Sequence, residues 1–283
     1  AEEGLAIEVV QMTRATDALP ALAQGELDVA GTNITSALLN AMARESGIRI
    51  VASTAQETAE MDCVYNGLVI RSGLPGASPA DITAETLKTL RFSTTLPTPS
   101  GYFLDVVLAS YGLSVDEIAL VDLPGSSAAL AALQEGAVDV VHFAEPWLTR
   151  VQATGAADIW LSQTVAMTEA QSSVLAFGPS LLVGNPEAGM RFMVAYLKGV
   201  RQYQAGKTER NLELLGTYLE LDQELLTAAC FPRIPADGVI FTQSIEDFAA
   251  WAAARDYIDR PLTGDVFWEP RFVQHAAEVL AQP

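Results

Sequence analysis

A repeat at a fixed offset constrains the fold of this chain more than any other feature of its sequence. The run ALAQGELDV at Ala21–Val29 matches ALQEGAVDV at Ala132–Val140, an offset of 111 residues that aligns Gly25 with Gly136. One short match between alanine-rich helices can arise by chance. This alignment extends in both directions without a gap, so we interpret it as two copies of one architecture.

The aligned copies share the order of their local patterns. Upstream, the alternating segment Leu5–Met12 aligns with Asp116–Leu123, and downstream Gly31–Ser36 aligns with His142–Trp147. Each copy therefore predicts strand, helix, glycine, strand, loop and helix. Because strands that alternate with helices form βαβ units, the repeat predicts an α/β fold of two similar lobes with parallel strands.

The second copy has an opening that the first copy lacks. A strand over Arg91–Thr95, a loop and a helix over Ser100–Tyr111 precede the second copy, and nothing ahead of Leu5 corresponds to them. That strand would be central in the sheet of lobe one, where a gap leaves backbone groups unpaired. We therefore expect the native chain to carry roughly 20 to 35 more residues upstream, about the scale of a βαβ unit.

Turn-forming composition at Ser72–Asp81 marks a candidate boundary between the lobes. Farther on, Leu181–Val183 is predicted as a strand, and from Pro186 onward the pattern is helical. We expect three segments: the first part of lobe one (1–82), lobe two (83–179) and a mostly helical second part of lobe one (180–283).

The charge balance excludes two classes of partner. The chain has 35 acidic against 16 basic residues and a formal charge of −19, which repels nucleic acid and anionic membrane surfaces. Cys63 and Cys230 lack the spacing of a metal site, and spacing alone leaves open whether they form a disulfide or two buried thiols. His142 and His275 are isolated from other ligand-type residues, which indicates structural or surface roles.

The stretch Leu96–Gly112 predicts a ligand-binding helix start. A Pro-containing loop leads into an amphipathic helix that Ser100 is expected to cap, with Gly101 beside it. A strand, a short loop and a helix N-terminus present free N–H groups at the edge of an α/β sheet, where small polar or anionic ligands bind. The alternative is an ordinary βα loop without a ligand.

Four segments resemble the NMT1/THI5-like family of solute-binding proteins, which serve ABC importers. They are ALAQGELDVAGTNITSALLNAMARESGIRIVAS, LPTPSGYFLDVVLASYGLSVDEIALVDLP, ALAALQEGAVDVVHFAEPWLTR and GVIFTQSIEDFAAWAAARDYIDR. The resemblance covers nearly the whole chain. It implies a two-lobed type II periplasmic-binding-protein fold, with a parallel-rich sheet in each lobe, helices on both faces and a helical C-terminal region.

The resemblance also implies a ligand cleft between lobes that close by hinge motion. The residues expected to face it are Thr32, Asn33 and Ser36 in lobe one and Thr98, Ser100, Gly101, Tyr102, Glu145 and Trp147 in lobe two. Three of them have a structural alternative. Asn33 can cap the following helix, Glu145 can serve the helix macrodipole, and Trp147 can be packing between elements.

These residues favour a neutral or zwitterionic heteroaromatic ligand, such as a pyrimidine or thiamine precursor. They include no Arg or Lys to meet a dianion, Glu145 would repel a nearby anion, and Tyr102 and Trp147 offer flat faces. The expected protein is periplasmic or extracytoplasmic, with a lipid anchor as one option. It is a monomer without a cofactor, delivering its ligand to an ABC permease.

Two other classes of function remain alternatives. Enzymes share this fold by resemblance, but the cysteine-rich motif of the pyrimidine-synthase type is absent, and no G-x-S-x-G, P-loop or H-E-x-x-H motif occurs. A ligand-binding sensor domain would use the same chemistry with a different partner.

Overall fold

The computed structural model of the chain describes residues 2–12, 17–74 and 81–281, and it divides the chain into two compact units. Unit 1 comprises Ala1–Gln56, Gln171–Gly206 and Arg233–Pro283, and unit 2 comprises Glu57–Ala170 and Lys207–Pro232. The chain therefore passes from one unit to the other four times. Among the described residues, no helix is long and apolar enough to span a bilayer.

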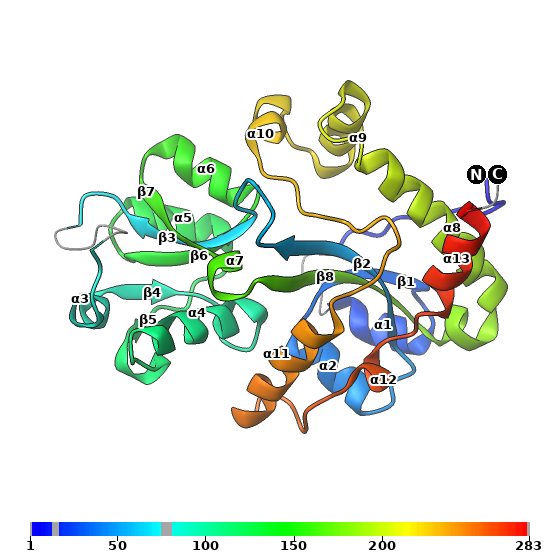
Figure 1. Ribbon diagram of the computed structural model, residues 1–283, viewed down its shortest axis with the longest axis horizontal. Helices are drawn as coiled ribbons and strands as arrows, with labels where there is room; N and C mark the ends of the chain where they lie inside the picture. Colours follow the sequence, from blue (N-terminus) through cyan, green and yellow to red (C-terminus); the bar gives the residue numbers. More distant parts are fainter. Residues whose placement is uncertain (1, 13–16, 75–80, 282–283) are drawn as a thin grey trace. The chain divides into compact units, whose positions relative to one another are not determined.

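Unit 2 is built on a five-stranded sheet in the order β5-β4-β6-β3-β7 (Figure 1). Strand β4 pairs in parallel with β5 and β6, whereas β3 pairs antiparallel with β6 and β7. The strands are β3 (Asn66–Arg71), β4 (Arg91–Ser93), β5 (Ala119–Leu120), β6 (Val140–Ala144) and β7 (Ala157–Ser162). The helices are α3 (Ala84–Thr89), α4 (Pro99–Ser110), η2 (Val115–Glu117), α5 (Ser126–Gln134), α6 (Trp147–Thr154), α7 (Gln163–Ala166), α9 (Glu209–Leu219) and α10 (Gln223–Ala228).

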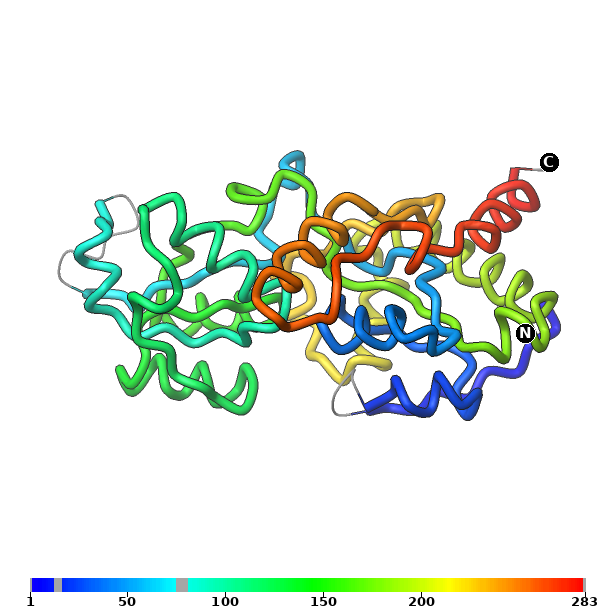
Figure 2. The backbone as a smooth tube through the Cα atoms, turned by 90° about the horizontal axis from the view of Figure 1, so that it is seen from below, coloured from blue at the N-terminus to red at the C-terminus, as the bar shows by residue number. Residues whose placement is uncertain are grey.

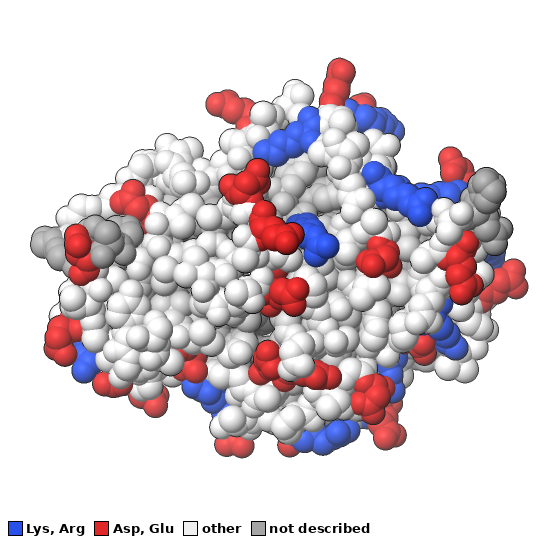
Figure 3. Space-filling view, viewed as in Figure 1, with Lys and Arg blue, Asp and Glu red and all other residues white. Residues whose placement is uncertain are grey.

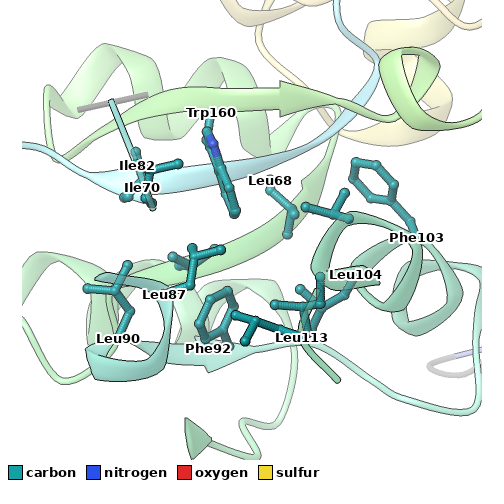
Figure 4. Close-up of a cluster of buried hydrophobic side chains, with 13 residues drawn as sticks. Leu68, Ile70, Ile82, Leu87, Leu90, Phe92, Phe103, Leu104, Leu113 and Trp160 are labelled. Atoms are coloured by element: carbon teal, nitrogen blue, oxygen red, sulfur yellow. The ribbon is translucent and has the colours of Figure 1, made fainter. Parts of the chain in front are cut away.

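The central strands β3 and β6 of unit 2 carry consecutive apolar residues, Leu68–Ile70 and Val140–Val141, because both faces of the sheet are buried. Successive side chains of a strand point to opposite faces, so Leu68 and Ile70 of β3 enter one core and Val69 enters the other. Helices α3 and α4 cover the first core, where Phe92 and Phe103 are fully buried (Figure 4). Helices α5 and α6 cover the second (Figure 1).

Unit 1 contains a three-stranded sheet in the order β1-β8-β2, with β1 antiparallel to β8. Its strands are β1 (Val29–Asn33), β2 (Arg49–Thr58) and β8 (Glu169–Phe177), the last two running across unit boundaries. Its helices are α1 (Ala18–Gln24), α2 (Ser36–Ala43), η3 (Ser180–Gly184), α8 (Pro186–Tyr203), α11 (Thr242–Ala254), α12 (Gly264–Phe267) and α13 (Arg271–Ala281).

The C-terminal helix completes a core of unit 1. Helices α8 and α13 pack side by side (Figure 2), and Phe272 of α13 meets Phe177 of β8 edge-on, with ring centroids 5.0 Å apart. Met193 and Leu197 of α8 are buried in the same cluster. The apolar face predicted for α8 therefore packs against the sheet and α13.

The 111-residue repeat is present in the folded chain. Strand β1 and helix α2 have the same bounds as β6 and α6 after the offset is applied. Gly25 and Gly136 both follow the preceding helix with positive φ, at 74° and 71°, a backbone conformation in which glycine avoids the Cβ penalty. The predicted α/β fold class is confirmed. The parallel-rich sheet expected in each lobe is not: in unit 2 only β5, β4 and β6 pair in parallel, because β3 runs antiparallel to both of its neighbours, and in unit 1 β1 is antiparallel to β8.

Two predicted strands are wrong. Leu5–Met12 forms no strand among the described residues, and Ile7, Val9 and Val10 are exposed. Its alternation of residue types is insufficient without a neighbouring strand to complete the backbone hydrogen bonds. Leu181–Val183 lies in the π-helical turn η3, where Leu181 and Leu182 are buried against α8. A short apolar run has the same composition in both conformations.

The unit boundaries differ from the expected segments 1–82, 83–179 and 180–283. The chain enters unit 2 at Glu57 and leaves it at Ala170, and Lys207–Pro232 returns to unit 2. A Cys63–Cys230 disulfide joins this returning segment to the rest of unit 2. The expected linker at Ser72–Asp81 lies for the most part outside the described residues, since 75–80 are not described.

Candidate functional site

The unit 1 candidates lie where β1 ends and α2 begins. Thr35 caps α2, because its Oγ1 accepts a 3.1 Å hydrogen bond from the Leu38 N–H. Asn33 is therefore not the capping residue, and its side chain is exposed. Thr32 is buried and donates its hydroxyl to the Asn33 carbonyl at 3.1 Å.

Ser36 is the first residue of α2 and is 5% exposed. Within the described part of the chain, its Oγ has no hydrogen-bond partner. Buried hydroxyls normally have one, and an unpaired polar group costs free energy. Ser36 and Asn33 thus place one buried and one exposed polar group at a helix start that can accept a ligand.

In unit 2 the N-cap residue of the helix lies two positions earlier than predicted. Thr98, rather than Ser100, is the N-cap residue of α4, and the Thr98 carbonyl accepts the Tyr102 N–H at 3.1 Å. The N–H groups of Ser100 and Gly101 precede that bond, so they belong to the first turn, where N–H groups lack helical acceptors. They are the donors expected for an anion or carbonyl oxygen.

Gly101 is required by close packing. A Cβ atom at this position would lie 2.6 Å from Leu96 Cα and closer still to the Leu96 carbonyl oxygen. Both are backbone atoms and cannot rotate away. The loop and the first turn of α4 therefore hold each other in place, which fixes the direction of the first-turn N–H groups.

The second helix start of unit 2 follows β6. Since β4 and β6 are adjacent and parallel, the segments after them, which contain Thr98–Tyr102 and Glu145–Trp147, leave the same edge of the sheet. Two of the three predicted site segments are thus on one edge of one unit. Thr32, Asn33 and Ser36 belong to unit 1.

The Glu145 carboxylate is bonded to the protein itself. Its Oε1 accepts the Thr149 hydroxyl at 2.9 Å and the Cys230 N–H at 3.0 Å, and its Oε2 accepts the Thr149 N–H at 3.1 Å. Glu145 thereby holds the first turn of α6 and the segment that carries the disulfide. The structural role of Glu145 is therefore larger than the interaction with the helix macrodipole that the sequence offered as the alternative to ligand binding.

Trp147 is the first residue of α6 and is half-buried against the core formed by α5, α6 and the sheet. The guanidinium carbon of Arg150 lies 4.7 Å from the centroid of its ring. Residues three apart share one face of a helix, which accounts for the contact. Sequence reasoning missed Arg150 because it considered only the loop before α6.

Polar groups around the disulfide were also missed. Glu57 is buried and accepts both the N–H and the side-chain amide of Asn66, at 3.0 and 2.6 Å. Burial, together with the charges of Glu57 and Glu145, raises the pKa of Tyr65 to about 12. No local motif connects these positions, and only the fold brings them together.

Neither histidine belongs to a group of metal-ligand side chains within the described part of the chain. Burial lowers the pKa of His142 to about 4, an effect that a hydrogen bond to Gln163 opposes, so the ring is neutral at pH 7. Across 2–12, 17–74 and 81–281, no three His, Cys, Asp or Glu side chains are grouped as metal ligands. The two cysteines are joined to each other, which settles the alternative between a disulfide and two thiols.

Comparison with known proteins gives a family and a fold. The model of the family described as NMT1/THI5 like matches residues 1–206. A comparison with curated protein sequences found no match.

Three solved structures share the fold at low sequence identity. The ligand-binding component of an ABC-type import system from Staphylococcus aureus, with zinc bound, has a TM-score of 0.75 and 16% identity, covering 95% of this chain and 87% of its own. The alkanesulfonate-binding protein SsuA from Xanthomonas axonopodis pv. citri, bound to MOPS, has a TM-score of 0.67 and 17% identity, covering 92% and 86%. A mutant of DSZB in complex with biphenyl-2-sulfinic acid has a TM-score of 0.68 and 15% identity, covering 94% and 90%.

Proposed function

The chain belongs to the NMT1/THI5-like family, and from that premise we propose that it is an extracytoplasmic solute-binding protein that delivers a small organic molecule to an ABC importer. The observation that carries the proposal is the pair of helix starts at one sheet edge of unit 2, with a repeat of the second in unit 1. Helix starts bind polar and anionic groups of small ligands. Asn33, Ser36, Ser100 and Tyr102 are the contacts we propose.

The ligand we favour is an organic anion such as a sulfonate. The sequence argument against an anion rested on the lack of Arg or Lys among the expected contacts and on Glu145, whose carboxylate accepts three hydrogen bonds from Thr149 and Cys230. SsuA, which has a similar fold, was solved with the sulfonate buffer MOPS. The second candidate is the heteroaromatic ligand expected from the sequence, which the flat rings of Tyr102 and Trp147 favour.

An enzymatic function has less support. DSZB, described as a desulfurization enzyme, has a similar fold, so the fold alone does not separate the two classes. Both cysteines of this chain form the Cys63–Cys230 disulfide, which leaves no thiol as a nucleophile. We therefore propose binding without catalysis, and a sensor domain remains the variant with a different partner.

The proposed location follows from the disulfide and the relatives. Structural disulfides persist in oxidising compartments such as the periplasm. SsuA from Escherichia coli is described as periplasmic. We propose a monomeric periplasmic or otherwise extracytoplasmic protein, free or lipid-anchored, whose partner is the membrane permease of an importer.

Binding can be tested directly. We expect native mass spectrometry of gently purified protein to detect a bound small molecule. A thermal-shift panel of sulfonates, pyrimidines, flavins and amines then identifies its class, since a ligand at ~100 times its Kd adds about 2.7 kcal/mol of stability. Absence of any shift across the panel, together with no bound molecule, would contradict the proposal.

Variants connect binding to the helix starts. Asn33→Ala in unit 1 and Ser100→Ala in unit 2 should each weaken calorimetric affinity about 3- to 10-fold, the usual worth of a polar contact. Ser110→Ala, at the other end of α4, is the matched control and should leave the Kd unchanged. Because Ser100→Ala keeps the backbone N–H, equal affinities for all three variants would remove the side chains of Asn33 and Ser100 from the site.

A further inference from the structure

We infer that Arg150 is the ligand's anion receptor, an inference that rests on the proposed binding function and names the chemistry of its ligand. The structural basis is the stacking of Arg150 on Trp147, a residue of the candidate site. The ligand class is an organic molecule that carries a sulfonate or carboxylate group beside an apolar or flat body.

Arg150 differs from the other cations of unit 2 in its partners. Arg71 and Arg91 bind Asp139, Lys88 binds Glu85 and Glu117, and Arg210 binds Glu213. Lys207 donates to the Thr227 carbonyl at 2.6 Å. Arg150 has no carboxylate or hydrogen-bond acceptor for its guanidinium within the described residues, and its guanidinium contacts the ring of Trp147 instead.

No acid binds Arg150 within the described residues, although acids are abundant in this chain. Acidic residues outnumber basic ones 35 to 16, and acidic side chains are spread widely over the face shown in Figure 3. The acid nearest in sequence, Glu145, already bonds Thr149 and Cys230 and forms no ion pair with Arg150 in the described structure. The five N–H donors of Arg150 are therefore available to an external anion.

The stack prepares Arg150 for this role. A guanidinium lying on an indole ring keeps its plane and its edge N–H groups while losing part of its rotamer freedom. An edge with two parallel donors matches a sulfonate or carboxylate. Lysine has neither the plane nor the fork, so the arrangement is specific to arginine.

The helix supports the same conclusion. Trp147 and Arg150 occupy the first turn of α6, on one face of the helix. A negative group near this turn is also stabilised by the helix N-terminus. The charge of Arg150 and the dipole of α6 therefore act on a bound anion in the same direction.

The test is calorimetry on the whole chain with MOPS and ethanesulfonate as anionic probes and uracil as a neutral one. Arg150→Gln should raise the Kd of the sulfonates about 10- to 100-fold, the worth of a charge-assisted hydrogen bond. The Kd of Arg150→Lys for the sulfonates should lie between those of Arg150→Gln and the wild type. Arg210→Gln, which removes one exposed charge from the same unit, should change the Kd less than about 3-fold.

Each outcome decides one claim. If the wild type binds a sulfonate and Arg150→Gln matches Arg210→Gln, the inference about Arg150 is overturned while the binding function stands. Binding of uracil without any sulfonate has the same consequence. Binding of none of the probes, with no co-purified molecule, overturns both. Thermal melting of each variant shows whether it folds normally. If Arg150→Gln does not, the sulfonate Kd of Arg150→Lys is compared with that of the wild type instead.

Discussion

The backbone N–H of Cys230 donates a 3.0 Å hydrogen bond to Oε1 of Glu145, across 85 positions of the sequence. The same oxygen accepts the Thr149 hydroxyl, and the Glu145 N–H donates to the Tyr65 carbonyl at 2.9 Å. One residue thus joins three segments of unit 2 beside the Cys63–Cys230 disulfide. Glu145 positions the start of α6, and Trp147 and Arg150 depend on it for their placement.

Replacing Glu145 should therefore lower stability. Glu145→Gln places an N–H₂ group toward one of three donors and removes the charge, so we expect the free energy of unfolding to fall by about 1–3 kcal/mol. Urea denaturation measures this. Glu135→Gln, an exposed acid just after α5, is the control and should stay within about 0.5 kcal/mol. Equal stability of both variants would show that the three bonds contribute nothing.

The disulfide should stabilise unit 2 by closing a loop of 167 residues. Reduction with dithiothreitol, or the double change Cys63→Ser and Cys230→Ser, is expected to cost about 2–5 kcal/mol. Limited proteolysis should then cut first within Lys207–Pro232. The reductant must leave the double variant unaffected, and a wild type equally resistant with and without reductant would contradict the expectation.

Gly101 and Gly199 make a matched pair of helical glycines. In an open helical position alanine is favoured over glycine by roughly 0.5–1 kcal/mol, and a Cβ atom added at Gly199 in α8 would have no neighbour within 4 Å. Gly199→Ala should therefore raise stability. Gly101→Ala should lower it by about 1–3 kcal/mol, because the Cβ meets the Leu96 backbone. Thermal melting measures both changes, and the melting temperature should rise for Gly199→Ala and fall for Gly101→Ala.

Acid stability should depend on Asp139. Burial of this carboxyl raises its pKa, but hydrogen bonds from Arg91 and Arg71 outweigh that effect and bring it from 3.8 to about 2. The unfolded chain therefore takes up the proton at higher pH than the folded chain. The stabilisation is complete above the ordinary pKa and is lost as pH falls toward 2.

Asp139→Asn should flatten this part of the stability profile. Urea denaturation between about pH 6 and about pH 2.5 should show a smaller loss for Asp139→Asn than for the wild type. Asp116→Asn, an exposed acid, should retain the wild-type slope. Parallel profiles for all three proteins would remove Asp139 as the cause.

The sequence predicted local features of the fold well. The repeat placed β1 with β6 and α2 with α6, since both copies carry the same short-range periodicity and the same glycine after a helix. The sequence-based prediction failed where contacts with other segments decide the conformation. Leu5–Met12 has the alternation of a strand without a neighbour, and Leu181–Leu182 is apolar in a turn.

In the candidate site, too, the features set by neighbouring residues could be predicted from the sequence, and those set by distant residues could not. The helix start at Thr98–Tyr102 could be read from Pro and Gly beside a strand, because those residues act on their own neighbourhood. The bonding of Glu145 could not, because its partner Cys230 is distant in sequence. Arg150 could have been found by following the face of α6 one turn beyond Trp147.

The four passages of the chain between the units bear on how the protein is made. Residues 57–170 leave the ribosome as one block, but unit 2 needs Lys207–Pro232, and the thiol of Cys63 has no partner until Cys230 has been synthesised. Unit 1 in turn awaits α13, which emerges after every other helix described here. Unit 2 cannot be completed before Lys207–Pro232 has been synthesised, and unit 1 cannot be completed before α13. A nascent chain stalled at residue 206 should therefore still be open to proteolysis in both units.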